Sequence, residues 1–139
     1  MDGKEDLASL VTREVDASDR VWTIGELARE YDVTLRAMRF YEAKGLLEPS
    51  RDGMVRFYDA RNHRRLRIIL RAKRAGFSLV EIRDLLDLAG SRDPRDRRLG
   101  VLRERLQRQV GRLEDMRRET DAALSAVGEE IGALDRASA

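Results

Sequence analysis

The chain has no cysteine, a single histidine and two prolines among its 139 residues, and aromatic side chains make up only 5%. The absence of cysteine excludes disulfides, thiolate metal sites, thiol redox sensing and a cysteine nucleophile. One histidine, His63, does not supply the nucleophile, base and orienting group that an active site needs. We therefore predict that the protein is not an enzyme and carries no resident cofactor or metal.

Long hydrophobic runs are also missing, since no stretch approaches the roughly 20 apolar residues that a bilayer crossing needs. The N-terminus lacks the basic-then-apolar pattern of a signal peptide, so we expect a cytoplasmic protein with no membrane partner. The few prolines, the 39% of charged residues and a strong apolar periodicity favour a mainly helical fold. The length suits one compact domain with an appendage.

The net charge of +2 conceals an uneven distribution of charge along the chain. Residues 1–20 carry 3 basic and 6 acidic side chains, and residues 77–139 carry 12 and 13. Residues 21–76, by contrast, carry 13 basic and 7 acidic side chains. A basic segment between acidic or balanced neighbours predicts an anionic partner for that segment, most often nucleic acid.

Changes in pattern divide the chain into five parts. Residues 1–20 show no sustained apolar period and are predicted to be a flexible N-terminal tail with one transient helical turn. Residues 21–88 carry regular helix and turn signals and are predicted to form the globular domain. Residues 89–94 contain helix breakers and form a linker. A long helix at 95–134 and a short tail at 135–139 complete the chain.

Two short helices open the globular domain. Thr23 and Glu26 have the spacing of a capping box, and Thr34 is a second N-cap whose helix ends near Gly45. This arrangement predicts a helix–turn–helix, which is too small to close its own core and needs a third element.

A hairpin and two further helices supply that third element. Asp52 and Gly53 stand between extended-prone residues, which predicts a small two-stranded wing. Asp59 and Ser78 are the N-caps of the two helices that follow. The sequence therefore predicts a winged helix–turn–helix.

The long helix at 95–134 carries apolar residues at steps of three and four, the spacing of a coiled-coil seam. A lone helix of this length would leave the whole stripe uncovered, so a second copy of the chain is the expected partner. The predicted dimerisation residues are Leu99, Leu102, Leu106, Val110, Leu113, Met116, Leu124, Val127 and Ile131.

Arginines occupy the positions from which such a domain would contact DNA. A helix–turn–helix presents the first turns of its second helix to the major groove, and Arg36 and Arg39 lie one turn apart there. Arginine can bond bidentately to a guanine edge. Arg51 and Arg56 on the wing would reach the flanking backbone or the minor groove. For any one arginine, the alternative is a solvated face on an ordinary helical bundle.

Five motifs follow one another along the globular domain: WTIGELA (22–28), VTLRAMRFYE (33–42), GLLEP (45–49), RFY (56–58) and GFSLVEI (76–82). In this order and spacing they resemble the winged helix–turn–helix of the MerR family of bacterial transcription regulators. The long C-terminal helix is also similar to the antiparallel dimerisation helix of that family.

The resemblance implies a homodimer with DNA-binding domains at opposite ends of an antiparallel coiled coil, bound to double-stranded promoter DNA at an interrupted palindrome. In this family the dimer bends and underwinds a promoter whose two RNA polymerase recognition elements are unusually far apart. Taken together, the residue pattern and the resemblance predict DNA contacts from Thr23, Thr34, Arg36, Arg39, Tyr41, Arg51, Arg56, Tyr58 and His63.

The effector is the least determined feature. Metal- and redox-sensing members of the family use cysteines near the end of the dimerisation helix, and this chain has none. Its short layout, with RRLRIILR (64–71) and IRDLLDL (82–88), is most similar to the subgroup that regulates branched-chain amino-acid and acyl-CoA catabolism. A small acyl-CoA-type metabolite is the effector class that this similarity suggests, while the effector itself stays unknown.

Two other functions fit the same residues. An architectural or excisionase-like DNA-bending protein would use the wing without ligand control and would show modest sequence preference with strong salt dependence. A coiled-coil adaptor would use the basic face to bind an acidic protein. A long dimerisation coil argues against the simplest excisionases, and specific binding to duplex DNA would argue against the adaptor.

Overall fold

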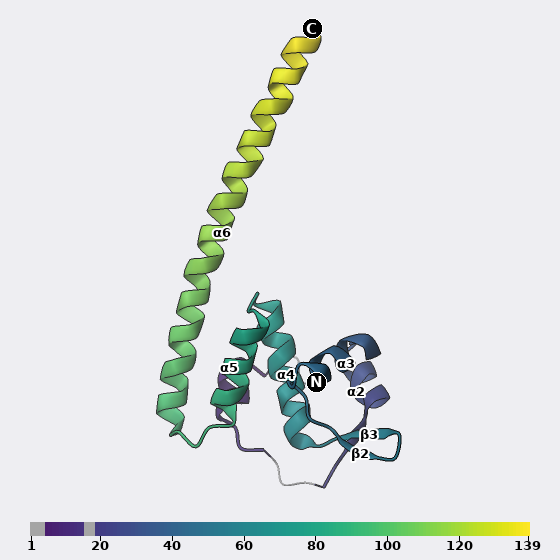
Figure 1. Ribbon diagram of the computed structural model, residues 1–139. Coiled ribbons are helices and arrows are strands. Elements are labelled where there is room, and N and C mark those ends of the chain that lie inside the picture. The colour runs from purple at the N-terminus through teal and green to yellow at the C-terminus, as the bar shows by residue number, and fades with distance from the viewer. Residues whose placement is uncertain (1–4, 16–18) are drawn as a thin grey trace. The chain divides into compact units, whose positions relative to one another are not determined.

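The computed structural model describes residues 5–15 and 19–139, so residues 1–4 and 16–18 of the predicted N-terminal tail lie outside the described part (Figure 1). The fold is mainly helical with one small sheet, as predicted. The chain divides into two compact units, residues 1–102 and residues 103–139. The elements in chain order are α1 (Leu7–Thr12), β1 (Trp22–Thr23), α2 (Ile24–Glu30), α3 (Leu35–Ala43), β2 (Ser50–Asp52), β3 (Val55–Tyr58), α4 (Ala60–Arg74), α5 (Leu79–Ala89) and α6 (Arg95–Ser138).

Local capping sets the helix starts at the predicted residues. Thr23 and Ser78 each form a complete capping box, in which the hydroxyl accepts from a backbone N–H three residues on and the glutamate there accepts from the N–H of the cap. Thr34 and Asp59 cap α3 and α4 through single side-chain bonds. These bonds satisfy N–H groups that the first turn of a helix leaves unpaired. Gly45 follows α3 with φ +72, a left-handed conformation that suits glycine.

The wing is a three-stranded antiparallel sheet in the order β1–β3–β2, where two strands were predicted. Arg51 of β2 lies opposite Arg56 of β3, and Gly53 takes φ +63 in the turn between them. The additional strand places Trp22 opposite Tyr58. A strand of two residues is too short to show the alternation of apolar and polar residues that indicates a strand, so the sequence did not predict β1.

The N-terminal segment differs from the flexible tail predicted for residues 1–20. Residues 7–12 form α1, which packs against α4 and α5 and buries its apolar side chains Leu7, Leu10 and Val11. A helix of six residues is unstable alone and is held by tertiary packing. It is also too short to display a periodic pattern, so the sequence showed three apolar residues without indicating what they pack against.

α4 lies at the centre of the first unit and contacts α1, α5 and β3. Apolar residues from all parts of this unit complete the core. The largest fully buried side chains are Leu10, Leu27, Met38, Leu46, Leu47, Tyr58, Leu66, Ile68, Ile69, Ile82, Leu85 and Leu86. In the described part of the chain, no helix has the length and apolarity needed to cross a bilayer.

Side chains of α4 hold the connection between α3 and β2. Asn62 is buried, and its Oδ1 accepts from the N–H of Glu48 at 2.8 Å while its Nδ2 donates to the carbonyl of the same residue at 3.1 Å. Arg65 Nε donates to the carbonyl of Leu46 at 2.8 Å. The polar backbone of the connection is thereby paired, and the start of the wing is tied to α4.

The second unit consists of α6 from residue 103 onward. α6 runs from Arg95 to Ser138, whereas the long helix was predicted over residues 95–134. Of the predicted dimerisation residues, Leu102 is already buried in the single chain, and Leu99 and Leu106 are half-buried. The exposed apolar residues of α6 are Val110, Leu113, Met116, Leu124, Val127, Ile131 and Leu134.

Candidate nucleic-acid interface

α2 and α3 form the predicted helix–turn–helix. Asp32 in the turn takes φ +53, a left-handed conformation that aspartate tolerates better than most residues. On α3, Met38 and Tyr41 are buried, which leaves Arg36 and Arg39 on the exposed side of the helix. Neither guanidinium has a hydrogen-bond or ion-pair partner among residues 5–15 and 19–139, so both are free to bind a ligand.

Glu42, in the last turn of α3, joins this helix to the wing. Its Oε1 accepts from Arg51 Nη2 at 2.9 Å and from Arg56 Nε at 3.0 Å, and its Oε2 accepts from the Tyr58 hydroxyl at 3.3 Å. The sequence does not mark Glu42 as a functional residue, because the partners of its side chain lie 9 to 16 residues away and no local spacing indicates them. The carboxylate fixes both wing arginines against the end of α3.

The electrostatics of this cluster keep Glu42 ionised. Burial raises the pKa of the Glu42 carboxyl, but hydrogen bonds from Arg56 and Arg51 outweigh burial and leave the pKa below its ordinary value. Burial, together with the adjacent Glu42 charge, raises the pKa of Tyr58 to about 12. At neutral pH the carboxylate therefore accepts charge-assisted hydrogen bonds from both arginines and a bond from the neutral phenol.

Replacing Glu42 by glutamine is expected to loosen the wing. The amide keeps the shape of the side chain but removes the charge that holds two arginines, so we expect the free energy of unfolding to fall by about 1–3 kcal/mol in urea denaturation. Since the pKa of Glu42 is lowered by folding, the carboxylate stabilises the fold above its unfolded pKa of about 4.3 and ceases to do so as the pH falls through the lower folded pKa.

The difference between wild type and Glu42→Gln should therefore be constant between about pH 5 and 7 and shrink below about pH 4. Asp52→Asn is the matched control, because Asp52 is exposed on the same hairpin, and its effect should stay within about 0.5 kcal/mol. Equal stability of wild type and Glu42→Gln at pH 7 would show that the carboxylate does not hold the wing.

Three of the predicted DNA-contact residues are enclosed by the fold to different degrees. Tyr41 and Tyr58 are buried, and His63 is half-buried. The His63 ring lies on Trp22 with ring centroids 4.4 Å apart, and its Nε2 is 3.1 Å from the Tyr31 hydroxyl. The motifs mark these residues in the sequence, but they do not separate an aromatic residue that packs from one that binds.

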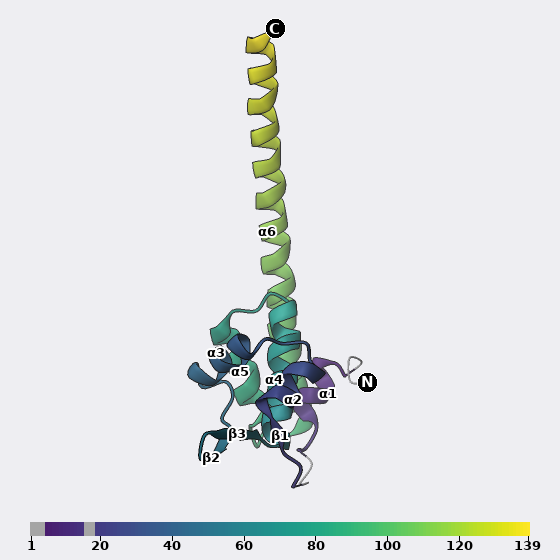
Figure 2. The ribbon, with the colours of Figure 1, turned by 90° about the vertical axis from the view of Figure 1, so that its right-hand side faces the viewer.

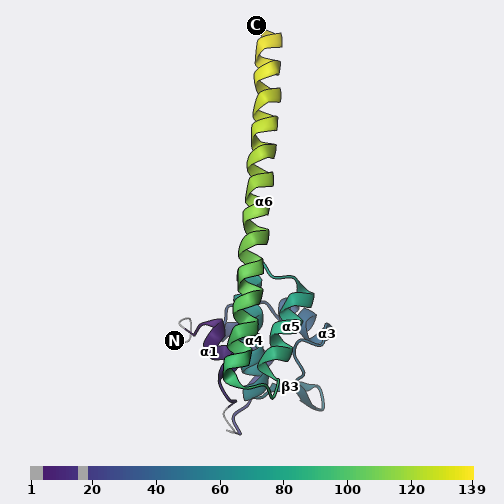
Figure 3. The same cartoon turned by 90° about the vertical axis from the view of Figure 1, so that its left-hand side faces the viewer.

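The other six predicted residues lie on α3, the wing and the two N-caps. Figures 2 and 3 show α3 and the β2–β3 hairpin on the same side of the first unit, with α1 on the opposite side. We call the four arginines there the arginine face. Its members are Arg36, Arg39, Arg51 and Arg56.

Two family models match overlapping parts of the chain. Residues 22–89 match the model described as MerR HTH family regulatory protein, and residues 63–127 match the model described as MerR, DNA binding. The HTH-type transcriptional regulator ZntR of Escherichia coli K12 is 33% identical over 102 residues, which are 69% of this chain and 71% of ZntR. The chain belongs to the MerR family. The expectation of a regulator rather than an enzyme agrees with this membership.

Other MerR-type relatives extend the comparison. Nodulation protein NolA of Bradyrhizobium sp. (strain NC92) is 40% identical over 103 residues, which are 70% of this chain but 41% of NolA. The chain thus spans less than half the length of that relative.

Solved structures show the same architecture. A MerR family transcriptional regulator from Bacillus cereus has a TM-score of 0.64 and 28% identity, with 79% of each chain covered. HiNmlR, a MerR family regulator lacking the sensor domain and bound to promoter DNA, has a TM-score of 0.54 with 73% of this chain and 80% of HiNmlR covered. At 21% identity, HiNmlR supports the fold alone.

The described residues offer no metal site. Among residues 5–15 and 19–139, no group of three or more histidine, cysteine, aspartate or glutamate side chains is placed to hold a metal ion. The absence of cysteine from the whole chain removes the thiolate ligands that metal-sensing members use.

Proposed function

We propose that this MerR-family chain is a sequence-specific transcription regulator that binds double-stranded promoter DNA as a homodimer. The observation that carries the proposal is the arginine face, in which Arg36 and Arg39 are exposed on α3 beside a wing held by Glu42. The second helix of a helix–turn–helix enters the major groove, where arginine reads guanine. The wing arginines are assigned to the flanking phosphates, which set the register of the protein on DNA.

The exposed stripe on α6 supports the dimer. α6 has 44 residues and rises ~66 Å, and its apolar side chains from Val110 to Leu134 are exposed in the single chain. Apart from the wider step between Met116 and Leu124, these residues are spaced three or four apart, which suits a coiled coil with a second α6. The family resemblance favours the antiparallel arrangement, which would place the two arginine faces at opposite ends of the coil.

Binding by two distant arginine faces suits an interrupted palindrome. In the proposed mechanism the dimer spans a promoter with a long spacer and bends and underwinds it, so that RNA polymerase meets both of its recognition elements. Such bending costs about 1–6 kcal/mol, which phosphate contacts at both ends would offset. The proposed location is the cytoplasm. The effector is not identified, and an acyl-CoA-type metabolite is the class that the subgroup similarity favours.

Selection of bound fragments from a bacterial genomic library, at near-physiological salt, tests the proposal. We expect enrichment of promoter fragments that share one interrupted palindrome. Recovery of all fragments alike, with binding that falls steeply as salt is raised, would instead support an architectural DNA-bending protein. Recovery of no DNA would support a protein-binding adaptor.

Arg36→Ala is expected to weaken binding to the selected palindrome by about 1–3 kcal/mol and to relax preference at one base pair. Arg36→Lys keeps the charge but cannot form the bidentate bond, so it should lose nearly as much specificity while keeping affinity for random duplex. Fluorescence anisotropy measures the affinity of each variant for a duplex with the palindrome and for a duplex of random sequence. Equal losses on the palindrome and on random DNA would assign Arg36 to a phosphate instead of a base.

A further inference from the structure

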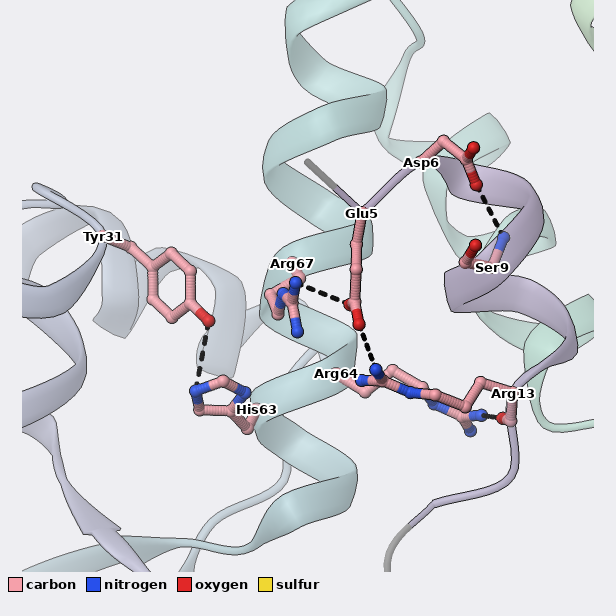
Figure 4. A network of polar contacts seen from close by, with 8 residues as sticks. All are labelled: Glu5, Asp6, Ser9, Arg13, Tyr31, His63, Arg64 and Arg67. Atoms are coloured by element: carbon pink, nitrogen blue, oxygen red, sulfur yellow. Dashed lines mark hydrogen bonds and ion pairs between the residues drawn. The ribbon is translucent and has the colours of Figure 1, made fainter. Parts of the chain in front are cut away.

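One buried arginine of the first unit has no ion-pair partner among residues 5–15 and 19–139. Arg64 of α4 is 8% exposed, and its Nη1 donates to the backbone carbonyl of Arg13 at 2.7 Å (Figure 4). Its Nε has no hydrogen-bond partner, and no carboxylate of the described residues pairs with it. Arg67, one turn further along the same helix, shows the contrast, because its Nη2 lies 2.5 Å from the Glu5 carboxylate. A buried charge without a counter-ion is unfavourable.

Arg64 lines a cleft of about 650 Å³ at the end of α1, where the start of α4 and the α5–α6 connection also contribute. Among the described residues that line the cleft, one side chain is acidic, that of Glu14. We call its basic residues the arginine cleft. They are Arg13, Arg61, Arg64, Arg92 and Arg98.

Arg98 repeats the features of Arg64. Its Nη1 donates to the carbonyl of Val11 at 3.0 Å, and its buried Nε has no hydrogen-bond partner within the part of the chain that the structure describes. Arg64 and Arg98 thus both donate to carbonyls at the end of α1, and neither forms an ion pair with a carboxylate of the residues that the structure describes.

The positive charges in the arginine cleft repel one another. Burial, followed by the charges of Arg13 and Arg61, lowers the pKa of Arg64. Arg13 pairs with Glu5, and Arg61 lies 3.7 Å from the Glu48 carboxylate, so these two are partly balanced. Along residues 5–15 and 19–139, no carboxylate forms an ion pair with the other three, Arg64, Arg92 and Arg98.

We infer that the arginine cleft binds a small polyanion carrying phosphate or carboxylate groups. Such a ligand supplies the missing counter-charge, and the planar guanidinium groups bind its oxygens bidentately. The volume of the cleft falls within the range of small-molecule sites. The inference stands apart from the proposed function, because it requires no DNA.

The cleft draws on residues outside the helix–turn–helix. Figures 2 and 3 show α1 on the side of the first unit opposite α3 and the wing, and Arg13 of the cleft directly follows α1. α1 also precedes the residues that either family model matches, so Arg13 is contributed from outside the matched segments.

Isothermal titration calorimetry of the full chain with inorganic phosphate, pyrophosphate and citrate, at an ionic strength held constant with sodium chloride, tests the inference. We expect one saturable site per chain, with a dissociation constant below about 1 mM for pyrophosphate or citrate and weaker binding of phosphate. Arg64→Gln and Arg92→Ala should each weaken binding by about tenfold or more.

Two variants control the experiment. Arg92 is exposed and lies outside the core, so Arg92→Ala reports on the cleft even where Arg64→Gln disturbs folding. Arg74 is an exposed arginine of α4 that lies outside the cleft, so Arg74→Ala should bind the anions like wild type. Absence of saturable binding, or equal binding by wild type and Arg92→Ala, would overturn the inference. Loss of duplex binding in Arg92→Ala with no small-anion binding would assign the cleft to DNA.

Discussion

A chain in which Leu113 is replaced by aspartate is expected to be a monomer and to lose binding to its operator. Leu113 lies within the apolar stripe of α6 and is 40% exposed in the single chain. In the proposed coiled coil this side chain is buried in the seam, where a carboxylate loses its hydration without gaining a partner. We expect the dimer dissociation constant to rise by at least about 100-fold, equivalent to about 3 kcal/mol.

Loss of the dimer should abolish operator binding even though the arginine face is unchanged. In a dimer the second half-site is bound at a high effective concentration, and a monomer forfeits that gain. Light scattering measures the mass, and electrophoretic mobility shift measures operator binding.

Ser125→Asp is the matched control, because Ser125 is exposed on α6 and lies off the apolar stripe. It adds the same charge and should leave both the dimer and the operator complex intact. A stable dimer of Leu113→Asp would exclude this stripe as the dimer interface.

The second large effect is expected at the N-terminus. Leu10→Ala should lower the free energy of unfolding by about 2–5 kcal/mol, because Leu10 is fully buried and its truncation leaves a cavity. A loss of this size is a large part of the stability of a small domain. Denaturation in urea measures it, with the slope of the transition reporting whether α1 unfolds with the rest of the unit.

Glu14→Ala is the control, since Glu14 is exposed just after α1, and its effect should stay within about 0.5 kcal/mol. A flexible tail would make the two substitutions indistinguishable. Unchanged stability of Leu10→Ala would therefore show that α1 does not belong to the folded unit.

Features set by neighbouring residues were predictable. The N-caps Thr23, Thr34, Asp59 and Ser78 all start helices, because each cap bonds to a backbone N–H three residues away. The wing turn at Gly53 follows from a two-residue signal for the same reason.

The candidate site was predictable only where exposure follows from helical spacing. Arg36 and Arg39 lie on the face of α3 opposite its buried residues, as the spacing indicated. His63 could not be placed in this way, because its burial depends on Trp22, more than 40 residues earlier in the chain. The role of Glu42 could not be predicted either, because its carboxylate gains its arginine partners only when the wing folds against α3.

The sequence by itself determined the N-caps and the wing turn, the exposed arginines of α3, the apolar stripe of α6 and the motifs that resemble the MerR family, because each of these depends on residues within a few positions of one another. Only the tertiary structure decided that α1 is part of the core, that Glu42 holds the wing and that an unbalanced group of arginines gathers at the end of α1. These features join residues as far apart as Val11, whose backbone carbonyl accepts, and Arg98, whose side chain donates. Such contacts leave no periodic trace in the chain, and they form only when the core brings the elements together.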